Sequence, residues 1–217
     1  TNVCIPGCEL ISVEKMQSTQ AMQAIAEHSD KTYTLLYTKH TALKIGMFAL
    51  ERMVQVMEMT QAGMVYADHY QQIDGVQKTA PVIDYQPGSL RDDFNFGSVL
   101  LFNANAFKKV IENTEEEYQY AGLYDLRLKI SQKSKLVHIN EYLYTEVESD
   151  KRKSGEKQFD YVDPKNRQVQ IEMEQACTNH LKEIGGYLYP IFRPVDFSSH
   201  TFEYEASVII PVRNRIR

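Results

Sequence analysis

Residues 33–74 read YTLLYTKHTALKIGMFALERMVQVMEMTQAGMVYADHYQQID, and this stretch decides the fold. Two short runs rich in β-branched and aromatic residues, 34–37 and 63–67, flank about fifteen residues with helical spacing. The pattern predicts two parallel strands joined by a right-handed crossover helix. Ligands of open α/β sheets bind beyond the carboxyl ends of the strands, so chemistry is expected at residues 38–40 and 68–70.

Composition and charge narrow the class of protein. Of the 217 residues, 43% are hydrophobic and 24% are charged, as in an ordinary globular domain. The formal net charge of −5 gives no basic footprint for nucleic acid. No apolar run approaches a membrane span and the first residues lack a signal peptide pattern, so a cytoplasmic protein without a transmembrane segment is expected. The first residue is Thr1, and we expect the chain to be a piece of a longer protein.

The three cysteines give no sign of a structural framework. Cys4, Cys8 and Cys177 are an odd number and lack the paired spacing of a zinc site. Free, buried or partly buried thiols are therefore expected.

Outside the opening stretch, periodicity and turn residues place the other elements. The crossover helix is expected to pack Met47, Leu50, Val54 and Met57 on the sheet. The remaining expectations are a strand near 10–13, a helix capped by Ser18 or Thr19, a loop or hairpin over 71–90, a strand at 99–102, a helix at 104–111, a helix at 118–131, a strand with a turn at 135–144, a helix at 163–184 and a strand at 206–211. The last helix is expected to bury Val169, Met173, Ala176, Leu181 and Ile184.

The stretch ASVIIPVRNR at residues 206–215 resembles the opening strand of family 2 glycosyltransferases, which helps to bind the nucleotide of a sugar donor. Residues 33–74 are similar to the middle of that fold, and YDLRLK at 124–129 resembles the end of the helix that carries the family's Glu-Asp motif. Further likenesses lie at 96–98 and 140–144, so that the resemblance covers about residues 19–147 and the terminal strand.

The resemblance implies an α/β fold of the GT-A type, Rossmann-like, with a mostly parallel sheet flanked by helices. Two early strands of the family have no counterpart, so the fold would be partial. It divides the chain into a glycosyltransferase-like domain at 1–147, a flexible charged segment at 148–162, a helix and Pro-containing arm at 163–205, and the first strand of a following domain at 206–217.

Departures from the family pattern fall on the chemical positions. The family's Asp-x-Asp, which holds Mn²⁺ or Mg²⁺ against the donor diphosphate, falls on Thr38 and His40. These hard cations prefer charged oxygen ligands, so binding of Mn²⁺ or Mg²⁺ should be weakened. The family's catalytic base falls on Gly122 and Leu123, whose side chains cannot accept a proton.

Other residues are candidates for the missing roles. Asp92 and Asp93 could supply a base or bind an acceptor hydroxyl, although adjacent acids before a strand also serve as solvated or capping groups. His40, Asp68 and His69 could hold a transition metal, or be structural.

Donor binding by resemblance falls on Thr38, His40, Asp68, Arg213 and Asn214. The terminal arginines could contact a diphosphate through forked donors, or be the end of a truncated chain.

Two functions of different classes follow. In the first, the chain is a glycosyltransferase that moves a sugar from a nucleotide-sugar donor to a saccharide or lipid-linked acceptor, and this portion is weak or inactive alone. In the second, it is a noncatalytic module that binds glycan or organises a partner domain on the same scaffold. The strand at 206–211 could also pair with a second copy and form a homo-oligomer.

Overall fold

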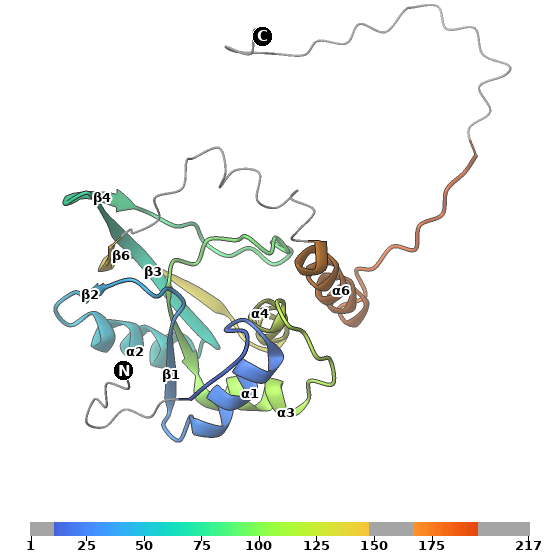
Figure 1. Ribbon diagram of the computed structural model, residues 1–217, viewed down its shortest axis with the longest axis horizontal. Coiled ribbons are helices and arrows are strands. Elements are labelled where there is room, and N and C mark those ends of the chain that lie inside the picture. The colour runs from blue at the N-terminus through green and yellow to red at the C-terminus, as the bar shows by residue number, and fades with distance from the viewer. Residues whose placement is uncertain (1–10, 148–166, 195–217) are drawn as a thin grey trace, which may run out of the picture. The chain divides into compact units, whose positions relative to one another are not determined.

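The computed structural model describes residues 11–147 and 167–194 (Figure 1). The chain divides into two compact units, residues 1–187 and residues 188–217. All helices and strands described below lie in the first unit. In the second unit, the described residues 188–194 are neither helix nor strand.

The first unit is built on a mixed six-stranded sheet. Its order is β1-β5-β3-β6-β2, with β4 paired to β3 outside this path. The strands are β1 Tyr33–Tyr37, β2 Leu43–Ile45, β3 Met64–Ile73, β4 Val76–Ala80, β5 Val99–Asn103 and β6 Leu136–Val147. The α/β class is confirmed.

The predicted predominance of parallel pairing is not found. Only β3 and β6 pair in parallel, and the other four described pairs are antiparallel. The two strands of the opening stretch, β1 and β3, do run in the same direction, but β5 lies between them and is antiparallel to both. Sequence periodicity identifies the strands but carries no information on which strand inserts between them.

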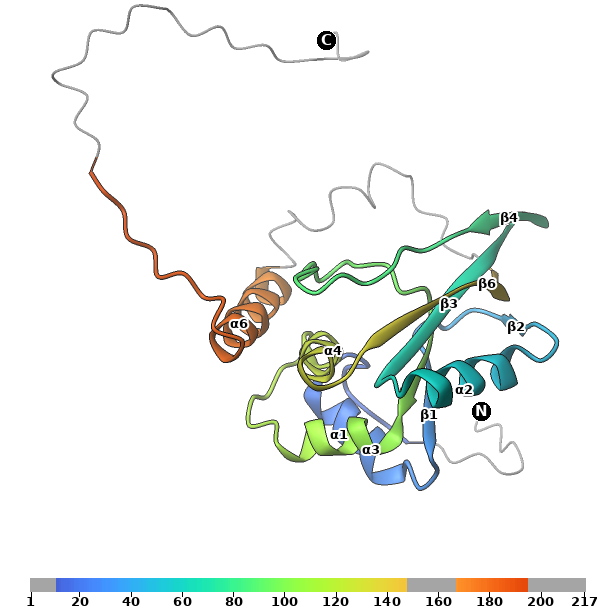
Figure 2. The same cartoon turned by 180° about the vertical axis from the view of Figure 1, so that it is seen from behind.

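The described residues form five helices: α1 Thr19–His28, α2 Ala49–Thr60, α3 Ala104–Glu112, α4 Gly122–Lys133 and α6 Arg167–Glu183. Figures 1 and 2 show α2 on one side of the sheet and α1, α3 and α4 on the other. Helix α6 packs against α4. None of the described helices is long and apolar enough to cross a membrane.

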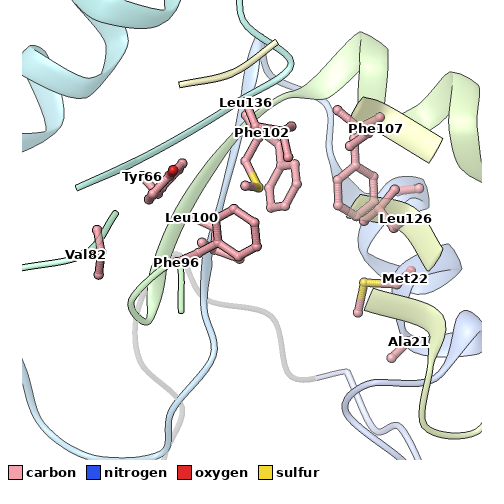
Figure 3. Packing of buried hydrophobic residues seen from close by; sticks show 13 residues of the cluster. Ala21, Met22, Tyr66, Val82, Phe96, Leu100, Phe102, Phe107, Leu126 and Leu136 are labelled. Carbon is pink, nitrogen blue, oxygen red and sulfur yellow. The ribbon is translucent and has the colours of Figure 1, made fainter. Parts of the chain in front are cut away.

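Two apolar clusters fill the spaces between these layers, and alternate residues of β3 divide between them. Met64 and Tyr66 face the cluster that includes Met22, Phe107 and Leu126 from α1, α3 and α4 (Figure 3). Val65 and Ala67 face the opposite cluster, under α2. Because successive side chains of a strand point to opposite faces, Asp68 and His69 are also directed to opposite sides of the sheet.

Local signals predicted several elements well. Ser18 caps α1, as predicted, and its hydroxyl accepts a hydrogen bond from the Ala21 backbone N–H at 3.0 Å. The Asp74-Gly75 turn joins β3 and β4 into a hairpin, and both turn residues have positive φ, at 50° and 81°. The predictions at 99–102, 104–111, 118–131 and 135–144 correspond to β5, α3, α4 and β6.

The buried face of α2 differs from the prediction. The sheet buries Ala49, Met53 and Met57, which are spaced four residues apart. Met47 is 87% exposed and Leu50 is 41% exposed, because Phe48 adopts a left-handed conformation and the helix starts only at Ala49. The predicted apolar stripe therefore began two residues before the helix.

The face of α6 is also different. Of the five residues predicted to be buried there, only Ala176 is fully buried, and Ile184 follows the last helical residue at 50% exposure. Its other buried residues are Glu172 and His180. The Glu172 carboxylate accepts hydrogen bonds from the backbone N–H groups of Tyr120 and Ala121, at the start of α4. This interface therefore combines polar recognition of a helix end, which a hydrophobicity pattern does not show, with an apolar cluster formed by Ala176 and residues of α4.

One further prediction is wrong, and several others fall on residues that the structure does not describe. Residues 11–13 are not a strand, contrary to the expectation near 10–13. The terminal strand at 206–211, the start of the last helix at 163, Cys4 and Cys8 lie outside the described residues, while Cys177 is a free, partly buried thiol.

Candidate functional site

A cleft of about 470 Å³ lies where β1 ends, between the loop that precedes β5 and the first turn of α4. It brings together three of the predicted candidates, Thr38, Asp92 and Asp93. Lys39 and Arg127 add cations to the same wall. The aromatic members of the lining are Phe94, Phe96, Phe102, Tyr120 and Tyr124. The cleft is therefore both charged and aromatic.

Buried hydrogen bonds hold the 81–97 segment, which forms one side of the cleft, against the sheet. The Tyr66 hydroxyl donates to the Ile83 carbonyl at 2.8 Å and accepts from the Tyr85 N–H at 2.7 Å. Burial raises the pKa of Tyr66 to about 12, so the phenol keeps its proton and remains a donor at neutral pH. Phe94 and Phe96 pack against each other, with ring centroids 4.4 Å apart, and continue this wall toward β5.

Asp68 binds the same segment and does not line the cleft. Its Oδ1 accepts from the Val82 backbone N–H at 2.8 Å and lies 2.8 Å from His138 Nε2. The other ring nitrogen of His138 lies 2.7 Å from Asp84 Oδ1. Asp68 is 1% exposed and Asp84 is exposed, so this chain of side chains runs from the interior to the surface and fastens residues 82–84 to β3 and β6.

His69 lies on the other side of the sheet, in a second polar group. Its ring stacks on Tyr144 at 5.1 Å, and its Nε2 is 3.5 Å from Glu146 Oε1. Burial lowers the pKa of His69, which favours the neutral imidazole. Glu146 Oε2 accepts from Lys39 Nζ at 2.5 Å. This network ties the end of β1 to β6, beneath the cleft.

Gly97 fits this network because it lacks a side chain. Its φ of +72° favours glycine, and an added Cβ would overlap the Tyr144 hydroxyl. That hydroxyl accepts hydrogen bonds from the backbone N–H groups of Ser98, at 2.9 Å, and of Val99, at 3.4 Å. The position of the loop relative to β5 and β6 therefore depends on Gly97.

The two acids of the cleft have different surroundings. Asp93 forms a two-pronged ion pair with Arg91, at 2.8 and 2.7 Å, which lowers the pKa of the carboxyl group. Asp92 accepts a hydrogen bond from the Asp93 N–H at 3.0 Å. A general base works best with a pKa near the operating pH, so Asp93 in this pairing is a weak base and a good hydrogen-bond acceptor.

Arg127 is the cleft residue that sequence reasoning missed. Its guanidinium donates to the backbone carbonyls of Ser89, at 3.2 Å, and Arg91, at 2.9 Å. It lies against the rings of Phe96, at 5.3 Å from the centroid, and Tyr124, at 4.8 Å. The side chain is only 5% exposed, and burial lowers the pKa of Arg127. An arginine among the apolar residues 126, 128 and 130 was the available signal.

The predicted metal ligands do not come together. Among residues 11–147 and 167–194, no group of three or more His, Cys, Asp or Glu side chains is arranged to hold a metal ion. Asp68 and His69 face opposite sides of the sheet, and His40 is exposed and does not line the cleft. Thr38 donates to the Ser98 carbonyl at 3.3 Å. The described residues at this place therefore do not fit Mn²⁺ or Mg²⁺, which require several oxygen ligands.

The position that resembles the family's catalytic base is closed. A Cβ at Gly122 would overlap the backbone of Ser18 and Thr19, which passes directly against it. Leu123 lines the cleft without a titratable group. Arg213 and Asn214, the remaining donor-binding candidates, lie outside the described residues.

A second, larger hollow of about 910 Å³ lies away from these residues. Amides and lysines line it, among them Asn103, Asn105, Lys109, Lys129 and Lys133. It contains none of the residues predicted from the sequence. At its edge Lys129 forms ion pairs with Asp125, at 2.8 Å, and with Glu116, at 2.9 Å, in a partly buried group.

Comparison with known proteins adds no assignment. No protein-family model matches the chain, and no curated protein matches it. The function must therefore be argued from the cleft itself.

Proposed function

We propose that this chain is a saccharide-binding domain on a glycosyltransferase-like scaffold, with weak or no sugar transfer of its own. The observation that carries the proposal is the composition of the cleft, in which Asp92, Asp93 and Arg127 share one hollow with five aromatic side chains. The cleft also lies beyond the end of β1, where the resemblance to family 2 glycosyltransferases would put the diphosphate of the sugar donor.

Saccharides need both kinds of surface that this cleft offers. The C–H faces of a sugar ring are apolar and pack on aromatic rings, while its hydroxyls require acceptors and donors of fixed geometry. Asp92 and Asp93 are exposed carboxylates and supply the acceptors. Lys39 and Arg127 are held by Glu146 and by backbone carbonyls, so the donors are ordered before a ligand arrives. Ordering in advance reduces the entropy cost of binding.

Three features favour binding over transfer. The Asp93 carboxylate has a lowered pKa, which makes it a poor proton acceptor. The space at Gly122 is filled by the backbone of residues 18 and 19. Among the described residues, the side chains around Thr38 do not form a site for a divalent cation. A diphosphate leaving group would therefore lack the charge neutralisation that a metal supplies.

A complete glycosyltransferase is the alternative, in which a nucleotide-sugar donor binds and a saccharide or lipid-linked molecule accepts the sugar. Lys39 favours this alternative, since it offers a cation at the end of β1, where the donor diphosphate would lie. Thermal unfolding with UDP, GDP and Mn²⁺ discriminates the two functions, because any ligand of the native state raises the unfolding temperature. Stabilisation by a nucleotide would favour the enzyme.

Binding to a panel of immobilised glycans tests the proposal directly. We expect retention of a subset of glycans by the wild-type chain, and loss of that retention in Asp92→Asn and Phe94→Ala. The matched control is Asp30→Asn, because Asp30 is an exposed acid paired with Lys31 and does not line the cleft. Retention that survives both cleft variants, or its absence from every glycan, would reject the saccharide site.

Cytoplasmic location and oligomerisation through residues 206–211 stay predictions.

A further inference from the structure

Arg127 is a buried cation without a buried anion. Its side chain is 5% exposed, and in the part of the chain that the structure describes no carboxylate forms an ion pair with it. Among the described residues, the guanidinium uses two of its five N–H donors on the carbonyls of Ser89 and Arg91, and Tyr85 is a further hydrogen-bonding neighbour. Buried charges in proteins are normally paired, because an isolated charge loses its hydration without compensation.

The neighbours of Arg127 support the cation but do not neutralise it. The rings of Tyr85, Phe96 and Tyr124 lie 5.8, 5.3 and 4.8 Å from its guanidinium carbon, and carry only the partial negative charge of their faces. The two carbonyls contribute dipoles. Burial remains the largest influence on the pKa of Arg127 and lowers it, so the surroundings do not fully replace water.

The other charges of the cleft are mostly satisfied within the protein. Asp93 is paired with Arg91, and Lys39 is paired with Glu146. Asp92 acts on Arg127 only through space, and it is exposed to water at the mouth of the cleft. The cleft thus has one hydrated acid at its mouth and one dehydrated cation in its wall. A ligand with an acidic group at one end and hydroxyls at the other is complementary to this arrangement.

We propose that the cleft selects an anionic saccharide, a sugar acid or sugar phosphate, and that Arg127 binds its acidic group while Asp92 accepts a hydroxyl. This inference rests on the proposed saccharide site and names its ligand class. The planar fork of arginine donates two parallel hydrogen bonds to a carboxylate or phosphate, a geometry that lysine cannot reproduce.

The test compares sugars that differ only in charge. Affinities of the wild-type chain are measured by titration calorimetry or ligand-observed NMR for methyl glucoside, methyl glucuronide and the methyl ester of that glucuronide, with glucose 1-phosphate as the phosphate arm. An ion-paired hydrogen bond is worth about tenfold or more in affinity. We expect the glucuronide, the phosphate or both to bind at least about tenfold tighter than the glucoside and the ester, with a preference that decreases at high salt.

Variants assign the preference to Arg127. In Arg127→Met the anionic and neutral sugars should bind equally, and Arg127→Lys should retain part of the preference. Arg52→Met is the matched control, because Arg52 is an arginine on α2 that pairs with Glu141 outside the cleft. The same preference in Arg127→Met would overturn the inference.

The wild-type comparison keeps the inference testable even if Arg127→Met does not fold. Equal affinity for the acid and its ester, together with no preference for the phosphate, would overturn it while leaving a neutral saccharide site intact. Failure to bind any sugar would instead overturn the proposed function as well.

Discussion

Replacing Gly97 by Ala tests whether the loop of the cleft is held against β6 by the Tyr144 hydroxyl. An alanine at a φ of +72° costs about 1–2 kcal/mol of backbone strain. Its Cβ would also lie within the space of the Tyr144 hydroxyl and 3.4 Å from His69 Nδ1. Displacing that hydroxyl leaves two buried N–H groups without a partner, which costs about 1–3 kcal/mol more. We therefore expect a total loss of about 2–5 kcal/mol in the free energy of unfolding.

A control variant at Gly88 separates the cost of backbone strain from the cost of displacing the Tyr144 hydroxyl. Gly88 has a φ of +95° and open space around the position of an added Cβ, so Gly88→Ala should cost the strain alone, about 1–2 kcal/mol. Urea unfolding followed by circular dichroism measures both variants. Tyr144→Phe removes the obstructing oxygen, and in that background Gly97→Ala should cost no more than Gly88→Ala. Equal losses for Gly97→Ala and Gly88→Ala, or additive losses in the double variant, would refute the reasoning.

Three further predictions follow from the geometry. Glu172→Ala should destabilise the fold by about 1–2 kcal/mol and speed hydrogen exchange at the Tyr120 and Ala121 amides, whereas Glu174→Ala on the exposed face of the same helix should do neither. Gly122→Glu should lower the free energy of unfolding by about 2–3 kcal/mol in a urea titration and produce no sugar transfer, since backbone fills the space; a stable, active variant would contradict this. Burial lowers the pKa of His69 below its value in the unfolded chain, so the stability that the neutral imidazole contributes is present above about pH 6.5 and is lost as the pH falls. Urea titrations at pH 7.5 and 5.5 should therefore show a smaller change in the free energy of unfolding for His69→Gln than for the wild-type chain.

Sequence patterns predicted the positions of the helices and strands better than they predicted which strands pair and which helix faces pack. Ser18 and the Asp74-Gly75 turn were both correctly placed. They are local signals, because the Ser18 hydroxyl binds a backbone N–H of the helix that it caps, and Asp74 and Gly75 tolerate the backbone conformation of the turn. The position of β5 between β1 and β3 was not predicted, because strand order is decided by contacts between distant segments. The same limit applies to the buried face of α6, where Glu172 binds backbone groups 51 and 52 residues away.

The site was predicted in part for similar reasons. Thr38, Asp92 and Asp93 share a cleft. Thr38 follows the end of β1, where chemistry was predicted, whereas Asp92 and Asp93 lie in the loop before β5 and were proposed as candidates because they are acids. Asp68 and His69 were grouped because they are adjacent in sequence, yet the alternation of β3 directs one to the 81–97 segment and the other to Tyr144. Arg127 was missed because its importance depends on its burial and on the lack of an ion-paired acid among the described residues, which only the folded chain shows.

The central claim is that the cleft at the end of β1 binds a saccharide. The most direct measurement is a titration of the isotope-labelled chain with a glycan retained on the panel, followed residue by residue in ¹⁵N–¹H NMR spectra. The account predicts that the largest saturable shifts fall on residues 92–97, Thr38 and the first turn of α4, around Tyr124. Saturable shifts centred instead on Lys109 and Lys133, in the larger hollow, would contradict it.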